Sequence, residues 1–485
     1  MENDVAGGRY EPFWVGFPLV DIHCCITPDI LHQLYQGVLK HLIWWIQEVM
    51  GQGELDSRIR SLPPACGVRH FENSISALSQ VSGTERKHII WILLSCLVGK
   101  IDPKGIIACR SLLSFIHLAQ YPSHNEETLG YMRGELDNWH KHRSYFIKKG
   151  PQEDFNIPKF HSLLHYIDAI RWFGTTDNYN TEMFERLHID FTKEGWRASN
   201  KRDHFPQMVN FLSRKEKIAS YDFYRSTIEE SPNAEGKDIK EEMGVGITRT
   251  LGQIVLAKLP QEPKKSLSRI LISHMAPGFL SQLKLSLNSF LPSSQQVSKS
   301  YALQSPLPFT TLDVWHHYKF IPTNMFDDES DGTRETIKAV PIYRDILIPQ
   351  FDTMIVLNSE EVESTAVQGS VIFIIFFLSG TDFESLGCRV GRLKIIFCLP
   401  STVDRFGFIE PAPLEWPKDP LAYVTWFTPF RASPNDATGM YRVQPAKDSK
   451  GQVQGSIISL TDVRQSCMLT PGKSSWDGTW NTPKY

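Results

Sequence analysis

The sequence predicts an α+β protein that is helical in its first half and β-rich in its second. Apolar residues recur at helical spacing up to about residue 220, most clearly over residues 28–49 and 85–99. Beyond Pro306, short apolar runs alternate with Pro, Gly, Asp and Asn, which favours an antiparallel sheet or barrel. A chain of 485 residues, 41% of them apolar, has the length of about three domains.

Charge, cysteine pattern and apolar runs narrow the class of protein. The net charge is −3, so a nucleic-acid partner requires a local basic patch. The eight cysteines form no CxxC pair, which argues against a zinc ribbon or a disulfide framework. The N-terminus lacks a secretory pattern, and the longest apolar run, Val371–Leu378, is far shorter than the roughly 20 residues that span a bilayer. We therefore expect a soluble intracellular protein with no membrane partner.

The first long helix is expected from Pro28 to about Val49. Thr27 is a candidate cap, Pro28 suits a first turn, and Gly51 ends the pattern. The preceding segment, Pro18–Ile26, is expected to form a short strand. The stripe expected to face a core comprises Leu31, Leu34, Tyr35, Val38, Leu42, Trp45, Ile46 and Val49.

Asp29 and His32 lie three residues apart at the start of this helix, on the face opposite the apolar stripe. One interpretation is structural, since a carboxylate in a first turn complements the helix dipole. The other is functional: Asp29 binds a divalent cation through oxygen, and His32 orders it or a bound phosphate. The spacing alone leaves both open.

A second segment with the same character begins at Thr181. Glu182 and Glu185 fall near the start of a helix expected over Thr181–Lys193, where they either complement its dipole or bind metal. Between Arg186 and Lys217 the chain has eight Lys/Arg against four Asp/Glu, with aromatic residues among them. Such a stretch is either a solvated charged surface or a contact for a phosphate backbone. The candidate nucleic-acid residues are Arg186, Lys193, Arg197, Lys201 and Arg202.

A third group, His161, His165 and Asp168, shares one face of a helix expected over Lys159–Phe173. Imidazole nitrogens at this spacing are able to bind zinc. The alternative is that they are hydrogen-bonded packing residues. No glycine-rich phosphate loop and no G-x-S-x-G elbow occurs, so a P-loop ATPase or serine hydrolase has no support.

The sequence resembles the Plavaka-type transposases of fungi, cut-and-paste DNA transposases related to the CACTA group. The resemblance spans about Phe13 to Trp476. It is carried by four blocks: FPLVDIHCCITPDILHQLYQGVLKHLIWW, GVRHFENSISALSQVSGTE, PKFHSLLHYIDAIRWFGTTDNYNTEMFERLHIDFTKEGWRASNKRD and LAYVTWFTPF. It implies an RNase H-like core in which two Asp and one Glu hold two Mg²⁺ or Mn²⁺ ions, about 3.5–4 Å apart.

Transferred to this chain, the resemblance places Asp29 and His32 at the second catalytic Asp, in an Asp-x-x-His signature. Asp21 with His23 is the less favoured alternative. The catalytic Glu is Glu182 or Glu185, with Glu182 preferred, so Asp29 and Glu182 are the expected metal ligands.

The resemblance also predicts five parts and an incomplete core. Residues 1–50 are expected to form a partial RNase H-like core, 51–158 a helical insertion, 159–220 helices that complete the core, 221–305 a linker and mixed region, and 306–485 a β-rich domain. Only 28 residues precede Asp29, too few for the first core strand and its neighbours. The first catalytic Asp is therefore expected to be missing, Asp4 being a poor candidate. Gly369–Leu386 fits the family poorly and is expected to be an insertion or a misread intron.

The sequence thus predicts a truncated transposase relative that binds DNA, holds Mg²⁺ or Mn²⁺ weakly, and has little or no strand-transfer activity. A nuclear location is expected, otherwise a cytoplasmic one, and homo-oligomerisation is left open. Two alternatives are a metal-dependent phosphohydrolase and a non-enzymatic protein-interaction relic acting through the β-rich domain. The phosphohydrolase requires His161, His165, Asp168 and His188 to converge.

Overall fold

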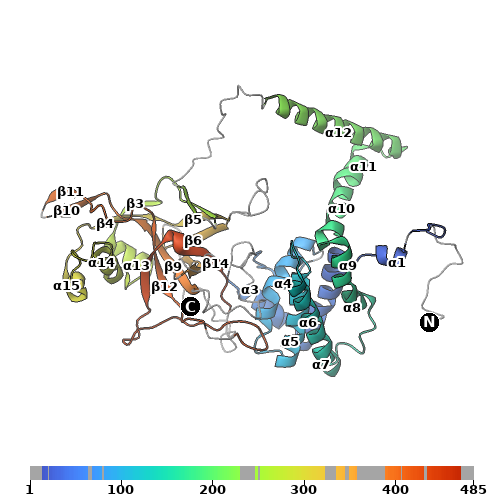
Figure 1. The fold of residues 1–485 in the computed structure, drawn as a ribbon, viewed down its shortest axis with the longest axis horizontal. Coiled ribbons are helices and arrows are strands. Elements are labelled where there is room, and N and C mark those ends of the chain that lie inside the picture. Colours follow the sequence, from blue (N-terminus) through green and yellow to red (C-terminus); the bar gives the residue numbers. More distant parts are fainter. Residues whose placement is uncertain are drawn as a thin grey trace. The chain divides into compact units, whose positions relative to one another are not determined.

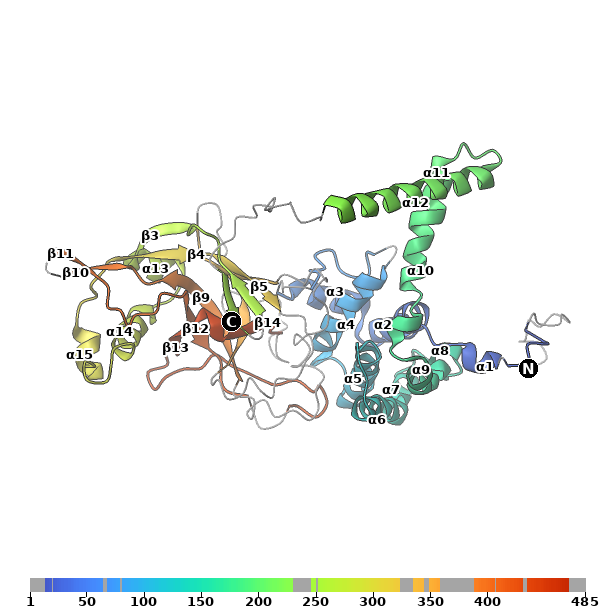
Figure 2. The same ribbon diagram turned by 45° about the horizontal axis from the view of Figure 1, so that its top comes forward.

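The computed structural model divides the chain into two compact units (Figures 1 and 2). The described residues are 14–19, 21–63, 68–78, 81–229, 246–249, 252–322, 335–343, 349–357, 388–405, 407–430 and 434–470. The first unit comprises those within Met1–Gly51, Gln80–Ile90 and Asp102–Glu235, and the second unit comprises the others. Asp4 and the whole segment Gly369–Leu386 lie outside the described residues.

The described residues of the first unit form helices only. They are α1 (Ile22–Cys25), η1 (Ile30–Leu39), α2 (Lys40–Met50), the first part of α4 (Gly83–Leu97), α5 (Pro103–Leu118), α6 (Glu126–His142), α7 (Ser144–Lys148), α8 (Pro158–His161), η2 (Ser162–His165), α9 (Tyr166–Phe173), η3 (Thr176–Tyr179), α10 (Glu182–Leu187), η4 (His188–Lys193), α11 (Glu194–Ala198) and α12 (His204–Glu229). These residues therefore do not show the sheet of an RNase H-like core.

The strand expected over Pro18–Ile26 is wrong. Asp21 accepts hydrogen bonds from the backbone N–H groups of His23 at 3.0 Å and Cys24 at 3.4 Å, and so caps the short helix α1. A side chain that satisfies free amide groups in this way favours a helical turn even in a segment of strand-like composition.

The first long helix is present, and its apolar stripe faces a core as predicted. Leu34, Tyr35 and Trp45 are at most 1% exposed. Trp45 stacks on Trp139 with ring centroids 6.2 Å apart and on Phe160 at 5.2 Å, so aromatic rings join α2, α6 and α8. Aromatic pairs at these distances stabilise a core beyond the area they bury.

The last helices of this unit form an extension, here called the arm (α10, η4, α11 and α12). α10, η4 and α11 follow one another without a break, and α12 folds back after a turn at residues 199–203 (Figures 1 and 2). Gly195 of α11 is buried, and a Cβ atom on it would lie 3.5 Å from Met208 and 3.7 Å from Phe211. The small residue therefore lets α12 approach α11 closely.

The second unit is β-rich. Its described strands are β1 (Gly246–Arg249), β2 (Gly252–Val255), β3 (Glu262–Ser266), β4 (Thr311–Trp315), β5 (His317–Pro322), β6 (Glu335–Val340), β7 (Gln350–Phe351), β8 (Thr353–Leu357), β9 (Cys388–Cys398), β10 (Thr402–Arg405), β11 (Phe408–Pro411), β12 (Leu421–Trp426), β13 (Gly455–Ser459) and β14 (Val463–Cys467). Its helices are α3 (Gln52–Ser61), the end of α4, α13 (Leu267–Ser273), α14 (Phe279–Ser289), α15 (Lys299–Gln304) and η7 (Leu460–Asp462).

The long strand β9 is the centre of the larger sheet. It pairs antiparallel with β12 along one edge, and with β4 and β8 along the other. Its side chains supply two cores: Leu393 and Ile396 belong to one, and Ile395 and Phe397 belong to the other with α13 and α14. The antiparallel β-rich half predicted from the sequence is confirmed.

Candidate functional site

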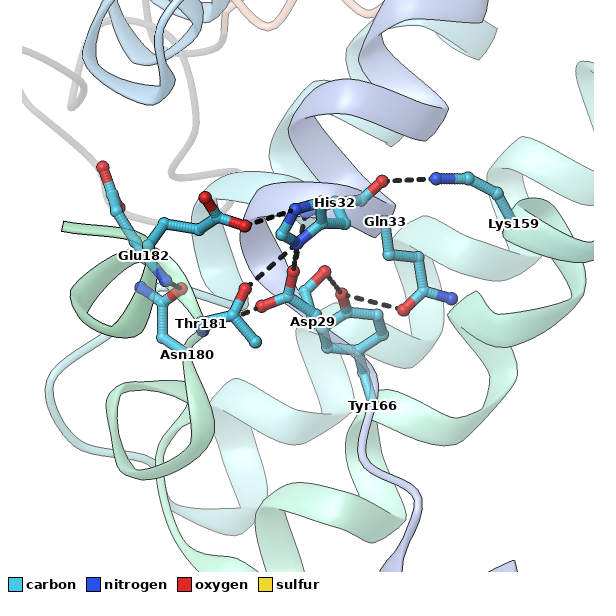
Figure 3. A network of polar contacts seen from close by, with 9 residues as sticks. Asp29, His32, Gln33, Lys159, Tyr166, Asn180, Thr181 and Glu182 are labelled. Carbon is cyan, nitrogen blue, oxygen red and sulfur yellow. Dashed lines mark hydrogen bonds and ion pairs between the residues drawn. The ribbon is translucent and has the colours of Figure 1, made fainter. Parts of the chain in front are cut away.

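Asp29 caps η1 and ties it to distant parts of the chain. Its Oδ2 atom accepts a hydrogen bond from the backbone N–H of His32 at 2.7 Å, and its Oδ1 atom accepts one from the backbone N–H of Thr181 at 3.0 Å (Figure 3). Tyr166 Oη donates to the carbonyl oxygen of Asp29 at 2.9 Å. Asp29 is thus the N-cap itself, not Thr27, and not a residue inside the first turn as predicted.

The imidazole of His32 lies between two carboxylates. Its Nδ1 atom is 2.8 Å from Asp29 Oδ2 and 3.1 Å from Thr181 Oγ1, and its Nε2 atom is 3.4 Å from Glu185 Oε1. His32 and Thr181 are 149 residues apart in the sequence. Residues from the two candidate segments therefore meet in one network. We call Asp29, His32, Thr181 and Glu185 the His32 network.

The charge state of Asp29 follows from its surroundings. Partial burial opposes the charged form, but hydrogen bonds from His32 and Thr181 outweigh it, so the pKa of Asp29 lies below its ordinary value. Burial raises the pKa of Tyr166 well above its ordinary range, which keeps its hydroxyl protonated as a donor to the Asp29 carbonyl.

Glu182, the preferred metal ligand in the sequence analysis, points away from His32 (Figure 3). Its backbone N–H donates to Asn180 Oδ1 at 3.0 Å. Its carboxylate lies against the start of α4, because a Cβ atom on Gly83 would be only 2.8 Å from Glu182 Oε1. The structure therefore brings Glu185, and not Glu182, into contact with His32.

The donor set in this arrangement does not fit a Mg²⁺ or Mn²⁺ centre. Both carboxylate oxygens of Asp29 already accept protein hydrogen bonds, and the Asp29 side chain is only 17% exposed. Within the described residues, no group of three or more His, Cys, Asp or Glu side chains is placed to hold a metal ion. Divalent cations of this type need several oxygen ligands around one point.

Two π-helical segments, η1 and η4, lie on the two candidate segments. Such segments are rare and occur often at functional sites. Lys159 contacts the first one, where its Nζ atom donates to the His32 carbonyl oxygen at 2.6 Å. Its side chain passes over Gly37, on which a Cβ atom would lie 2.2 Å from Lys159 Cδ. No local sequence pattern indicates Lys159, Thr181 or Tyr166 as site residues, since only the fold brings them to Asp29 and His32.

The five candidate nucleic-acid residues are all exposed on the arm. They are Arg186 on α10, Lys193 at the end of η4, Arg197 on α11, and Lys201 and Arg202 in the turn before α12. Arg186 lies 3.9 Å from Asp190, with its side chain 85% exposed. Within the described residues, none of the five forms a hydrogen bond or ion pair with the His32 network.

The third candidate group is not assembled as a metal centre. His161 and His165 approach each other, with Nε2 atoms 3.4 Å apart, but Asp168 faces Arg171 at 3.9 Å. In the part of the chain that the structure describes, no metal-binding group includes these residues or His188. These four residues therefore do not form the convergent metal site that the phosphohydrolase alternative requires.

Two further expectations concern membranes and the β-rich domain. Among the described helices, none combines the length and the apolar character required to cross a bilayer. On the β10–β11 hairpin, Phe408 and Ile409 are 73% and 80% exposed, so the β-rich domain has exposed apolar side chains on this hairpin.

Comparison with known protein families finds a match at the N-terminal end of the chain. Neither a curated protein nor a solved structure matches the chain. The segment that matches a family model contains Asp29 and His32. It ends before the last three of the four sequence blocks that carry the wider resemblance. Residues 2–46 match the family model described as Plavaka transposase, so similarity to that family is shown for this N-terminal segment.

Proposed function

We propose that this chain is a DNA-binding relative of the Plavaka transposases, in which the arm is the contact surface for duplex DNA. The observation that carries the proposal is the His32 network. It joins the segment that matches the family, through Asp29 and His32, to Thr181 and Glu185 at the base of the arm. The matched segment thereby anchors the part of the unit that bears the basic residues.

The charge of the arm supports the choice of partner. Eight Lys/Arg against four Asp/Glu between Arg186 and Lys217 make this stretch basic in a chain whose net charge is −3. Among the described side chains, no carboxylate forms an ion pair with Lys193, Arg197, Lys201 or Arg202, so their charges are available to phosphates. Neutralising phosphates with Lys and Arg releases counterions, which is the main source of sequence-independent DNA affinity.

The proposal concerns binding rather than strand transfer. The proposal does not include a Mg²⁺ or Mn²⁺ centre at Asp29, because both carboxylate oxygens of Asp29 accept hydrogen bonds from protein N–H groups. The RNase H-like core stays a prediction, since the described residues around Asp29 are helical. A DNA partner implies a nuclear location.

The test replaces three basic residues of the arm together: Arg197→Gln, Lys201→Gln and Arg202→Gln. The matched control makes the same charge change at exposed residues of the β-rich unit: Lys418→Gln, Lys447→Gln and Lys450→Gln. We expect the arm variant to bind all duplex sequences more weakly. The slope of log affinity against log salt should fall by up to about 3, given about 0.9 per phosphate contact. An unchanged slope, or an equal loss in the control, would show that the arm is only a solvated surface.

A further inference from the structure

A pocket lies on the arm where α11 meets α12, outside the His32 network. Its volume is about 430 Å³, and its lining comprises Thr192, Lys193, Trp196, Arg197, His204 and Met208. Pockets that hold small molecules or single chemical groups are usually about 300–1,000 Å³. Figure 2 shows the two helices meeting at the end of the arm.

The turn at residues 199–203, which joins the helices that line the pocket, is held by hydrogen bonds from Gln207. Gln207 Nε2 donates to Asn200 Oδ1 at 2.8 Å and to the Arg202 carbonyl at 2.6 Å. Lys201 and Asp203 have positive φ angles of 65° and 41°, a conformation that costs energy for residues other than glycine. A strained turn held by several bonds indicates a surface whose shape is defined before a ligand arrives.

Trp196 is the aromatic face of this pocket. Trp196 lies on α11, beside α12, and is 39% exposed. His204 packs edge-on against it, with ring centroids 4.6 Å apart and planes at 76°. The contact restrains the indole while leaving part of it open to a ligand.

Two cations flank the indole. Lys193 and Arg197 are three residues before and one residue after Trp196, and both line the pocket. Among the side chains that the structure describes, neither forms an ion pair with a carboxylate. An aromatic ring beside two uncompensated cations is the combination that binds a nucleotide, the ring stacking on the base and the cations contacting the phosphate.

We propose that this pocket binds one unstacked base of unpaired DNA, with the base on Trp196 and the neighbouring phosphates on Lys193 and Arg197. The inference rests on the proposed function, because it takes DNA as the partner of the arm. It adds a preference for unpaired ends or single strands over blunt duplex. A base inside a duplex reaches such a pocket only after it leaves its stack.

The experiment compares two fluorescein-labelled probes by anisotropy: a blunt duplex, and the same duplex with a short unpaired thymidine overhang. We expect the full-length protein to bind the overhang probe more tightly. Trp196→Ala should weaken that binding by roughly 5- to 150-fold, the range for losing one stacked base, and should weaken blunt-duplex binding much less. Trp196→Phe should restore most of the loss, because phenylalanine also stacks.

Trp172→Ala is the matched control, since Trp172 is an exposed tryptophan on α9, 61% accessible and outside the pocket. Equal affinity of wild type and Trp196→Ala for the overhang probe would overturn the inference, as would an equal loss on both probes. A change in oligomeric state without a change in overhang binding would overturn it too, by assigning the pocket to another copy of the chain. Absence of any blunt-duplex binding by wild type would instead contradict the proposed function.

Discussion

At the scale of single residues, His32 links the start of η1 to the base of the arm. Its ring reaches Asp29 on one side and Glu185 on the other. The two contacts differ in exposure, since the Asp29 side chain is 17% exposed and that of Glu185 57%. Solvent screens the more exposed pair, so the Asp29 side should dominate the energetics.

Asp29→Ala should therefore destabilise the protein more than Glu185→Ala. Losing the cap of η1 and the partner of the Thr181 amide is expected to cost about 1 kcal/mol or more. Losing Glu185 should cost between about 0 and 1 kcal/mol, as for other exposed pairs. Thermal denaturation of the two variants measures the difference, and the reverse order of melting temperatures would refute this account of the network.

The lowered pKa of Asp29 predicts the pH dependence of its contribution. A carboxyl group whose pKa is depressed on folding contributes stability above its unfolded value, here ordinarily 3.8, and loses it as the pH falls through the folded pKa. Compared with Asp29→Asn, the wild type should thus be more stable at neutral pH. That advantage should disappear in acid below pH 3.8. Urea denaturation at a series of pH values tests this, and an advantage that persists at the lowest pH would contradict it.

At the scale of elements, the absence of a side chain at Gly37 allows the Lys159 side chain to pass close over η1. An alanine there would place its Cβ atom 2.2 Å from Lys159 Cδ and 3.2 Å from the His32 carbonyl oxygen. The hydrogen bond from Lys159 to that carbonyl would have to break or shift.

Gly37→Ala should for this reason lower the free energy of unfolding, although alanine is the better helix former. The matched control is Gly134→Ala in α6, where a Cβ atom meets nothing within 4 Å. That substitution should raise stability by about 0.5–1 kcal/mol through helix propensity alone. Urea denaturation compares the two, and stabilisation by both would show that Lys159 adjusts without cost.

The elements also show what the sequence is able to predict. The helix over Leu34 and Trp45 and the β9 and β12 strands were predictable, because apolar period and turn residues are local signals. The strand at Pro18–Ile26 was wrong because one side chain, Asp21, outweighs composition. Glu182 and Glu185 were not separable in the sequence, since two residues three apart near a helix start have equivalent spacing. Their different contacts, with Gly83 and with His32, arise only from the fold.

At the scale of the whole molecule, the family match and the charged arm lie in the same unit. Residues 2–46 match the Plavaka family model, and the arm belongs to the unit that contains them. The β-rich unit contributes a separate pair of cores around β9. The sequence predicted the change from helices to strands, whereas the division into five parts stays a prediction.

The most direct test of the central claim is lysine acylation footprinting of the full-length protein with and without duplex DNA. The account predicts that DNA protects Lys193 and Lys201 of the arm from modification. Exposed Lys418, Lys447 and Lys450 of the β-rich unit should react equally in both conditions. DNA binding that leaves the two arm lysines fully reactive, or that protects only the lysines of the β-rich unit, would contradict the claim.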